Sequence, residues 1–141
     1  MRTAKLFSAI MLGFSLISCF SEEGTGVFGK SHVVVTGHIV DARNGNAVSG
    51  VIVELVIREN CSGPPIASPF VFTTNGQGRF GGKLVISGDL GFQRGCISYE
   101  VTPSADSGLQ GEQGSFEQVN IFREPTPPDT LRLDLVLESS Q

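Results

Sequence analysis

Strict alternation of apolar and polar residues is the feature that most limits the folds open to this chain. Between positions 131 and 137 every odd residue is leucine, and Arg132 and Asp134 stand between the leucines. Residues 51–58 repeat the pattern, with Val51, Val53, Leu55 and Ile57 in step and Glu54 and Arg58 out of step. A period of two places alternate side chains on opposite faces of a strand, and no helix produces it. Both segments are therefore predicted as strands with one buried face.

Turn residues divide the rest of the chain into further short strands. Asn44-Gly45 predicts a turn, and Asn75-Gly76 predicts a tight hairpin, because this dipeptide adopts positive φ values readily. The proline-rich residues 59–69 and the polar residues 104–115 are predicted as loops. The predicted strands are 33–40, 51–58, 70–74, 79–86, 95–102, 116–123 and 131–137. Seven short strands and no amphipathic helix predict an all-β domain, a seven-stranded antiparallel β-sandwich.

The first 18 residues are predicted to be a removed signal peptide. Arg2 and Lys5 precede an apolar stretch, 6–17, that is shorter than the roughly 20 residues needed to cross a bilayer. Leu16-Ile17-Ser18-Cys19 resembles the bacterial lipobox. The resemblance implies cleavage before Cys19 and attachment of a lipid to the Cys19 sulfur. The alternative is an ordinary secretory signal followed by an incidental cysteine.

Three regions are predicted to follow the signal peptide. Residues 19–30 form a flexible tether, since 20–29 are mostly small, polar or acidic and follow neither a strand nor a helix period. Residues 31–138 form the sandwich, and 139–141 form a short tail. We expect a membrane-anchored lipoprotein of the bacterial cell envelope, on the periplasmic or surface face of the outer membrane. The acidic residues after Cys19 resemble a surface-export signal, although Phe20 occupies its first position; a solvated linker is the simpler explanation.

The cysteines and the net charge limit the cross-links and the partners that the chain can have. Cys61 and Cys96 remain once Cys19 is assigned to lipid, and an even pair in an exported domain predicts a disulfide; two reduced thiols are the alternative. The chain has net charge −4, and loss of the two basic residues of the signal leaves 8 basic and 14 acidic residues, or −6. This charge argues against a nucleic-acid partner.

Candidate metal ligands are few. Asp41, Asn44 and Asn46 could offer oxygens to calcium, but their spacing matches no known calcium loop, and such residues also suit turns. His32 and His38 would lie roughly 20 Å apart on an extended strand and are expected to be surface residues. We therefore predict no metal site and no cofactor, and leave a weak calcium site near Asp41 open.

No catalytic set is recognisable in the sequence. The chain has no Gly-x-Ser-x-Gly motif, and no cysteine remains as a nucleophile once the three are assigned. An iron dioxygenase on a similar sandwich would use two tyrosines and two histidines, and this chain has one tyrosine, Tyr99. The sequence therefore predicts that the chain is not an enzyme.

Three motifs in order resemble the carboxypeptidase regulatory-like domain. They are Val35-Thr36-Gly37 with Val40-Asp41, then Ala47-Val48-Ser49-Gly50-Val51 with Val53, then Thr73-Thr74-Asn75 with Gly78 and Phe80. The resemblance spans 33–137 and implies a transthyretin-like seven-stranded sandwich of a kind that mostly serves in noncatalytic accessory or adhesion modules. The sequence departs from the pattern at Asn75, where aspartate is usual, and in the inserts 59–69 and 87–95.

These observations predict a noncatalytic, lipid-anchored envelope module that mediates protein–protein interaction or structural support. Its partners would be the membrane, through the lipid, and another envelope protein met through loops or a sheet edge; no binding residue is assigned. The alternative is a carbohydrate-binding, starch-binding-like module. Such sites stack sugars on exposed aromatic rings, whereas this chain has no tryptophan and one tyrosine, and Phe72 or Phe80 is expected to face inward.

Overall fold

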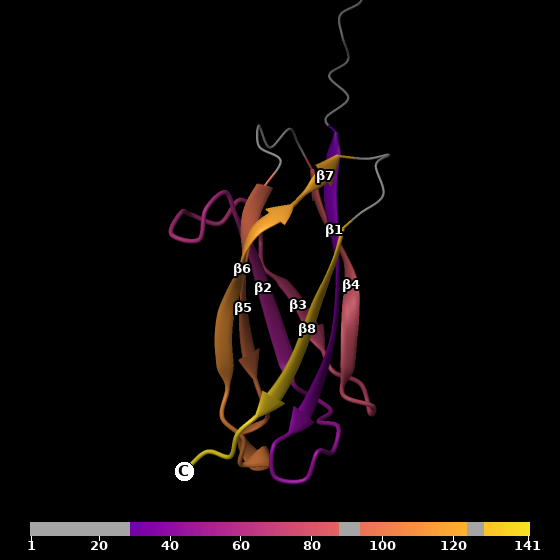
Figure 1. Cartoon of the computed structure of the whole chain (residues 1–141), viewed down its shortest axis with the longest axis vertical. Helices are drawn as coiled ribbons and strands as arrows, with labels where there is room; N and C mark the ends of the chain where they lie inside the picture. Colours follow the sequence, from indigo (N-terminus) through magenta and orange to yellow (C-terminus); the bar gives the residue numbers. More distant parts are fainter. Residues whose placement is uncertain (1–28, 88–93, 124–128) are drawn as a thin grey trace, which may run out of the picture.

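The chain folds as two facing β-sheets, as the computed structural model shows for residues 29–87, 94–123 and 129–141 (Figure 1). The signal peptide, Cys19 and nearly all of the tether lie outside these residues. A single short 3-10 helix, η1 (Ala105–Ser107), accompanies the strands of the described part. The strands are β1 (Lys30–Asp41), β2 (Ile52–Arg58), β3 (Phe70–Thr73), β4 (Arg79–Ser87), β5 (Arg94–Thr102), β6 (Glu112–Asn120), β7 (Phe122–Arg123) and β8 (Thr130–Leu137). The prediction of an all-β sandwich is confirmed.

Each sheet is built around one or two central strands. In the first, which we call the β1 sheet, β1 lies between β4 on one side and β7 and β8 on the other. In the second, the β2 sheet, the order is β3-β2-β5-β6. All of these pairs are antiparallel except β1 with β8, which run parallel over residues 34–41 and 130–137. The predicted antiparallel arrangement therefore holds for every pair but this one.

The predicted alternation decides which side chains form the core. Val51, Val53, Leu55 and Ile57 are fully buried between the sheets, while Ile52, out of step with them, is 47% exposed. On β8 the odd positions again face inward: Leu133 and Leu137 are buried, and Leu131 and Leu135 pack against the core at its edge. Burial of these aliphatic faces is the main driving force for the fold.

The predicted strand 116–123 is divided in the structure. Its first part belongs to β6, which begins earlier, at Glu112, and pairs with β5. The chain then leaves the β2 sheet at the buried Ile121, and β7 pairs with β1 in the other sheet. Eight strands therefore replace the predicted seven, and residues 112–115, predicted as loop, are part of a strand.

The predicted hairpin at Asn75-Gly76 takes a different form. β3 pairs with β2 and β4 pairs with β1, so the turn carries the chain from one sheet to the other. The Asn75 side-chain oxygen accepts hydrogen bonds from the backbone N–H groups of Gln77 (2.9 Å) and Arg79 (3.0 Å). The positive φ value, 68°, belongs to Gly78 rather than to Asn75 or Gly76. Side-chain capping by asparagine, and not a two-residue turn, sets this corner.

The predicted disulfide between Cys61 and Cys96 is present, with the two Cα atoms 5.1 Å apart. It ties the 59–69 connection to β5. The connection also folds back on the end of β2, because Ile66 N–H donates to the Ile57 carbonyl and the Arg58 guanidinium donates to the Gly63 carbonyl. A small hollow of about 220 Å³ lies beside the disulfide, next to an irregularity in β6 where Gln118 has a φ of 57°.

Candidate functional site

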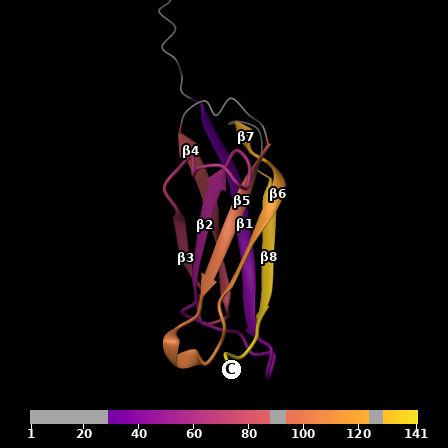
Figure 2. The same ribbon diagram turned by 90° about the vertical axis from the view of Figure 1, so that its left-hand side faces the viewer.

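Three connections lie at one end of the sandwich and form an irregular surface there. They are residues 42–51 after β1, residues 103–111 between β5 and β6, and residues 138–141 after β8. We call this end distal, because β1 begins at Lys30 at the opposite, proximal end and reaches it at Asp41. Figure 2, turned by 90°, again shows η1, the 42–51 connection and the last residues of the chain at this end. We refer to the three segments as the distal loop surface.

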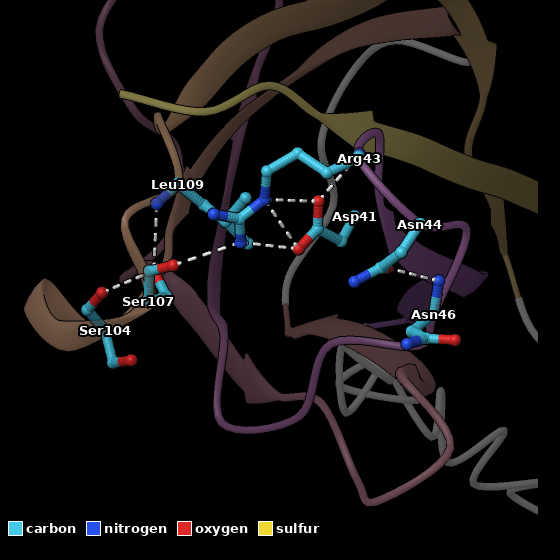
Figure 3. A network of polar contacts seen from close by, with 7 residues as sticks. All are labelled: Asp41, Arg43, Asn44, Asn46, Ser104, Ser107 and Leu109. Carbon is cyan, nitrogen blue, oxygen red and sulfur yellow. Dashed lines mark hydrogen bonds and ion pairs between the residues drawn. The ribbon is translucent and has the colours of Figure 1, made fainter. Parts of the chain in front are cut away.

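A buried carboxylate organises this surface (Figure 3). Asp41 ends β1 and is 7% exposed. Its side chain accepts hydrogen bonds from the backbone N–H of Arg43 (2.8 Å), from the Arg43 Nε (3.0 Å) and from the Arg43 Nη2 (2.6 Å). The same Nη2 donates to the Ser107 carbonyl, 3.3 Å away on η1. The pair therefore joins the connection after β1 to the connection between β5 and β6.

The electrostatic state of the pair follows from these contacts. The side-chain hydrogen bond from Arg43, and then its backbone N–H, hold the pKa of the Asp41 carboxyl below its ordinary value of 3.8. The hydrogen bond to Asp41 raises the pKa of Arg43 in turn. Both groups are therefore charged at neutral pH.

The segment 103–111 is held by its own hydrogen bonds and by the tail. The Ser107 hydroxyl donates to the Ser104 carbonyl and accepts from the N–H of Leu109, whose side chain is buried in the core. Beyond it, the N–H of Gln110 donates to the Glu138 carbonyl, and the N–H of Ser140 donates to the Gly108 carbonyl. The residues after β8 are thus hydrogen-bonded to the segment 108–110 of this connection.

The residues considered as calcium ligands, Asp41, Asn44 and Asn46, form hydrogen bonds within the turn after β1. Asn44 accepts a hydrogen bond from the backbone N–H of Asn46 (2.9 Å) through its side-chain oxygen, and Gly45 takes a φ of 70° and donates its N–H to the Asp41 carbonyl. The Asp41 carboxylate faces Arg43. No group of three or more His, Cys, Asp or Glu side chains able to hold a metal ion occurs among the residues that the structure describes.

Two hollows open on the distal loop surface on either side of Gln110. The larger, about 640 Å³, is lined by the end of β5, the start of β6 and residues between them, and its charged groups are Glu100 and Glu112. The second, about 620 Å³, is bounded by Gln110 and by residues 138–141, and Glu138 adds a third carboxylate. Both hollows are shallow, and their charged groups are acidic. They suit basic or small apolar side chains of a partner.

A further hollow, of about 490 Å³, crosses the outer face of the β2 sheet. Glu54 and Glu100 lie directly opposite each other there, on neighbouring strands. Tyr99 borders it, with its ring against Phe116 at a centroid distance of 5.8 Å. Burial raises the pKa of the Tyr99 hydroxyl, and the negative charge of Glu112 raises it further.

The aromatic residues bear on the carbohydrate alternative. Phe70, Phe72, Tyr99 and Phe116 pack against the core, and Phe80 belongs to it. The large apolar side chains that are exposed in the described part of the chain are aliphatic: Ile52, Val71, Val85 and Val136. These residues offer no exposed ring on which a sugar could stack.

The histidines differ from expectation. His32 was predicted at the surface but is 2% exposed, and His38 is half-buried. Both lie on β1, whereas Tyr99 lies on β5 in the other sheet. The structure therefore does not bring these three residues together.

Sequence reasoning missed Arg43, Ser107 and the carboxylates of the larger hollow. The spacing of Asp41 and Arg43, two residues apart, was a usable signal for an ion pair. Ser107 lies 64 residues from Arg43, and no local pattern connects them.

Comparisons with known proteins extend these observations at the level of fold. No protein-family model and no curated protein matches the chain. Among solved structures, the chain is similar to 3-chlorocatechol 1,2-dioxygenase from Rhodococcus opacus 1CP, with a TM-score of 0.52 and 12% identity over 78% of this chain and 61% of that one. It is also similar to the dioxygenase domain of a dioxygenase carbohydrate-binding protein fusion from Streptomyces sp. SirexAA-E, with a TM-score of 0.53 and 12% identity over 82% and 84%.

A third similar structure is the C-terminal domain of the shaft pilin spaA from Lactobacillus rhamnosus GG. Its TM-score is 0.47, and its identity is 12% over 77% of this chain and 98% of that one. In the described residues no helix is long and apolar enough to cross a membrane.

The comparisons correct one prediction. The sequence predicted that the chain is not an enzyme, but the two similar structures described first are dioxygenases, with TM-scores of 0.52 and 0.53. This sandwich therefore occurs in enzymes, and the fold does not exclude a catalytic function. At 12% identity the likeness shows the fold and assigns no reaction to this chain.

Proposed function

We propose that the chain is a lipid-anchored protein-binding module of the bacterial cell envelope, with a carboxypeptidase regulatory-like, transthyretin-like sandwich. Its anchor would be Cys19 in Leu16-Ile17-Ser18-Cys19, and its binding site would be the distal loop surface. The partner would be another envelope protein that offers basic and apolar side chains.

The position of the distal loop surface is the observation that supports this proposal. Lys30 begins β1 eleven residues after Cys19, and β1 has 12 residues, of which Asp41 is the last. At a rise of about 3.4 Å per residue the distal end lies roughly 40 Å from the point where the tether joins the domain. An anchored domain would therefore leave this end unobstructed.

The construction of the surface also suits binding. Loops that carry binding residues need a rigid support, because ordering them on binding costs conformational entropy. Here the buried Asp41, the Ser107 hydroxyl and the tail after β8 hold the loops by hydrogen bonds. Glu100, Glu112 and Glu138 give the two distal hollows negative charge, which would favour a basic partner.

Site-specific photo-cross-linking in living cells tests the proposal. A photoreactive residue would replace the exposed Gln110, which borders both distal hollows, and a control would carry it at the exposed Ser62, in the 59–69 connection. We expect one discrete cross-linked envelope protein from position 110 and none from position 62. Glu112→Arg should reduce that product severalfold. Equal products from both positions, or a product that Glu112→Arg leaves unchanged, would show that the distal loop surface is not the binding site.

A further inference from the structure

The outer face of the β1 sheet carries an unusual share of the positive charge. Side chains in step with the core residues Val33, Val35 and Ile39 face inward, so Lys30 and His38 on β1 face outward. By the same alternation Arg79 and Lys83 on β4 and Arg132 on β8 lie on the outer face. We call this surface, made by β4, β1 and β8, the basic face; Figure 1 shows the three strands side by side.

The charge of this face is opposite to that of the whole chain. Seven lysine and arginine side chains are described, and four of them, Lys30, Arg79, Lys83 and Arg132, lie here. Asp134, paired with Arg132, is the acidic residue within the three strands that shares the face. The three strands thus place four basic side chains and one acidic side chain on this face, in a chain whose net charge is −4. The basic residues are thus gathered rather than scattered.

The shape of the face indicates the kind of partner. Arg79 lies opposite His38 and Lys83 lies opposite Val34, while Lys30 lies at the far end of β1. The charges therefore extend over eight residues of β1, about 27 Å at 3.4 Å per residue. None of the four hollows described above includes a residue of this face. By the same alternation His32 lies on the outer side of β1, but it is 2% exposed, so the side of β1 next to Lys30 is covered at that point. An extended array of exposed basic side chains matches a planar anionic partner better than a small ligand, which would reach one or two of the charges.

We propose that the basic face docks on the anionic headgroups of the membrane in which the chain is anchored. The inference rests on the lipid anchor of the proposed function. The eleven residues from Cys19 to Lys30 reach at most about 38 Å when fully extended, and Lys30 itself belongs to the face. The anchor would thus hold the basic face within reach of the headgroups, where each basic side chain is attracted to anionic lipid. The β2 sheet and the distal loop surface would remain open to a partner.

The lysine side chains of the basic face can report on this contact, because contact with the membrane would slow their chemical modification. It has three lysines, Lys5 in the signal and Lys30 and Lys83 on the basic face. Mature protein purified from membranes would be added to vesicles of phosphatidylcholine alone, or with phosphatidylglycerol, and pulsed with formaldehyde and a borane reductant. Formaldehyde is uncharged, so the vesicle charge does not repel it. Mass spectrometry of peptides then gives the methylation rate of each lysine.

We expect both lysines to react at least about fivefold more slowly on the anionic vesicles, and the difference to vanish in about 1 M salt, where screening acts within about 3 Å. Arg79→Gln combined with Arg132→Gln should remove most of the protection. The matched control, Arg58→Gln with Arg94→Gln in the β2 sheet, should retain it. Equal rates on the two kinds of vesicle would overturn the proposal, as would equal effects of the two double variants.

Vesicle flotation separates failure of this inference from failure of the anchor. Flotation with both kinds of vesicle, with equal labelling, would leave the anchor standing and refute the docking face. Flotation with anionic vesicles alone would support the face and refute the anchor. Flotation with neither would refute both.

Discussion

At the residue scale, Asp41 has a different role from the cation ligand that the sequence suggested. Asp41 belongs to the first motif of the family resemblance, and together with Asn44 and Asn46 it could offer oxygen ligands to a cation. The structure shows instead a carboxylate bound by one guanidinium, with Asn44 closing the turn. A charge this little exposed is stable only when it is paired and hydrogen-bonded, and Arg43 supplies both interactions.

The ion pair gives the distal loop surface a defined dependence on pH. Because the pKa of Asp41 is lower in the folded chain than its ordinary value of 3.8, the pair stabilises the fold above that value. This stabilisation is lost as the pH falls through the folded pKa. We expect the Nε–H resonance of Arg43 to keep its shifted position down to pH values below 3.8, and then to move.

Asp41→Asn should abolish that shift at every pH and speed amide exchange at Gly45 and Leu109. The matched variant Asp106→Asn removes a carboxylate from the exposed surface of η1. It should change neither observable, and a similar response in the two variants would contradict the role given to Asp41.

At the element scale, period-two alternation was sufficient to find β2 and β8 and their buried faces. It predicted the inward residues of β2 and β8, because burial of one sheet face imposes the pattern directly on the sequence. It did not predict that 116–123 changes sheets at Ile121, nor that β8 runs parallel to β1. Those features depend on pairing between segments distant in sequence, and one strand pattern carries no information about its neighbours.

The distal loop surface was the least predictable part. Its contacts join Arg43 to Ser107 and Gln110 to Glu138 through backbone groups, which any residue type provides. The amino-acid composition of these loops therefore does not predict which loops contact one another. The disulfide, by contrast, was predictable because cysteine is rare here and two remained after Cys19 was assigned to the lipid.

The corner between β3 and β4 tests how the sheets are joined. A Cβ atom added at Gly78 would lie 2.5 Å from the Ile39 carbonyl oxygen, and Gly78 has a φ of 68°, whereas Gly76 has open space around it. Gly78→Ala should therefore lower the free energy of unfolding by about 2 kcal/mol or more. Gly76→Ala should change it by less than about 0.5 kcal/mol. Urea unfolding measures both, and equal losses would refute the turn geometry described here.

At the scale of the whole molecule, the disulfide and the proposed lipid both belong to an exported protein. The Cys61–Cys96 bond joins positions 35 residues apart and braces the proximal end of the sandwich. Chain-entropy arguments give such a cross-link about 3–4 kcal/mol of stability. Cys61→Ser with Cys96→Ala should lower the free energy of unfolding by about that amount, and reduction of the native protein should do the same. A loss below about 1 kcal/mol in both experiments would show that the bond contributes little.

Intact mass of the protein purified from bacterial membranes, measured before and after reduction, is the decisive measurement. We expect the mass of residues 19–141 plus acyl groups, and a gain of two hydrogens on reduction. That result would support an anchored, disulfide-braced sandwich and direct the search for partners to the envelope. A mass without acyl groups, or a chain that still contains Leu16-Ile17-Ser18, would contradict anchoring at Cys19 and remove the basis for placing the distal loop surface relative to a membrane.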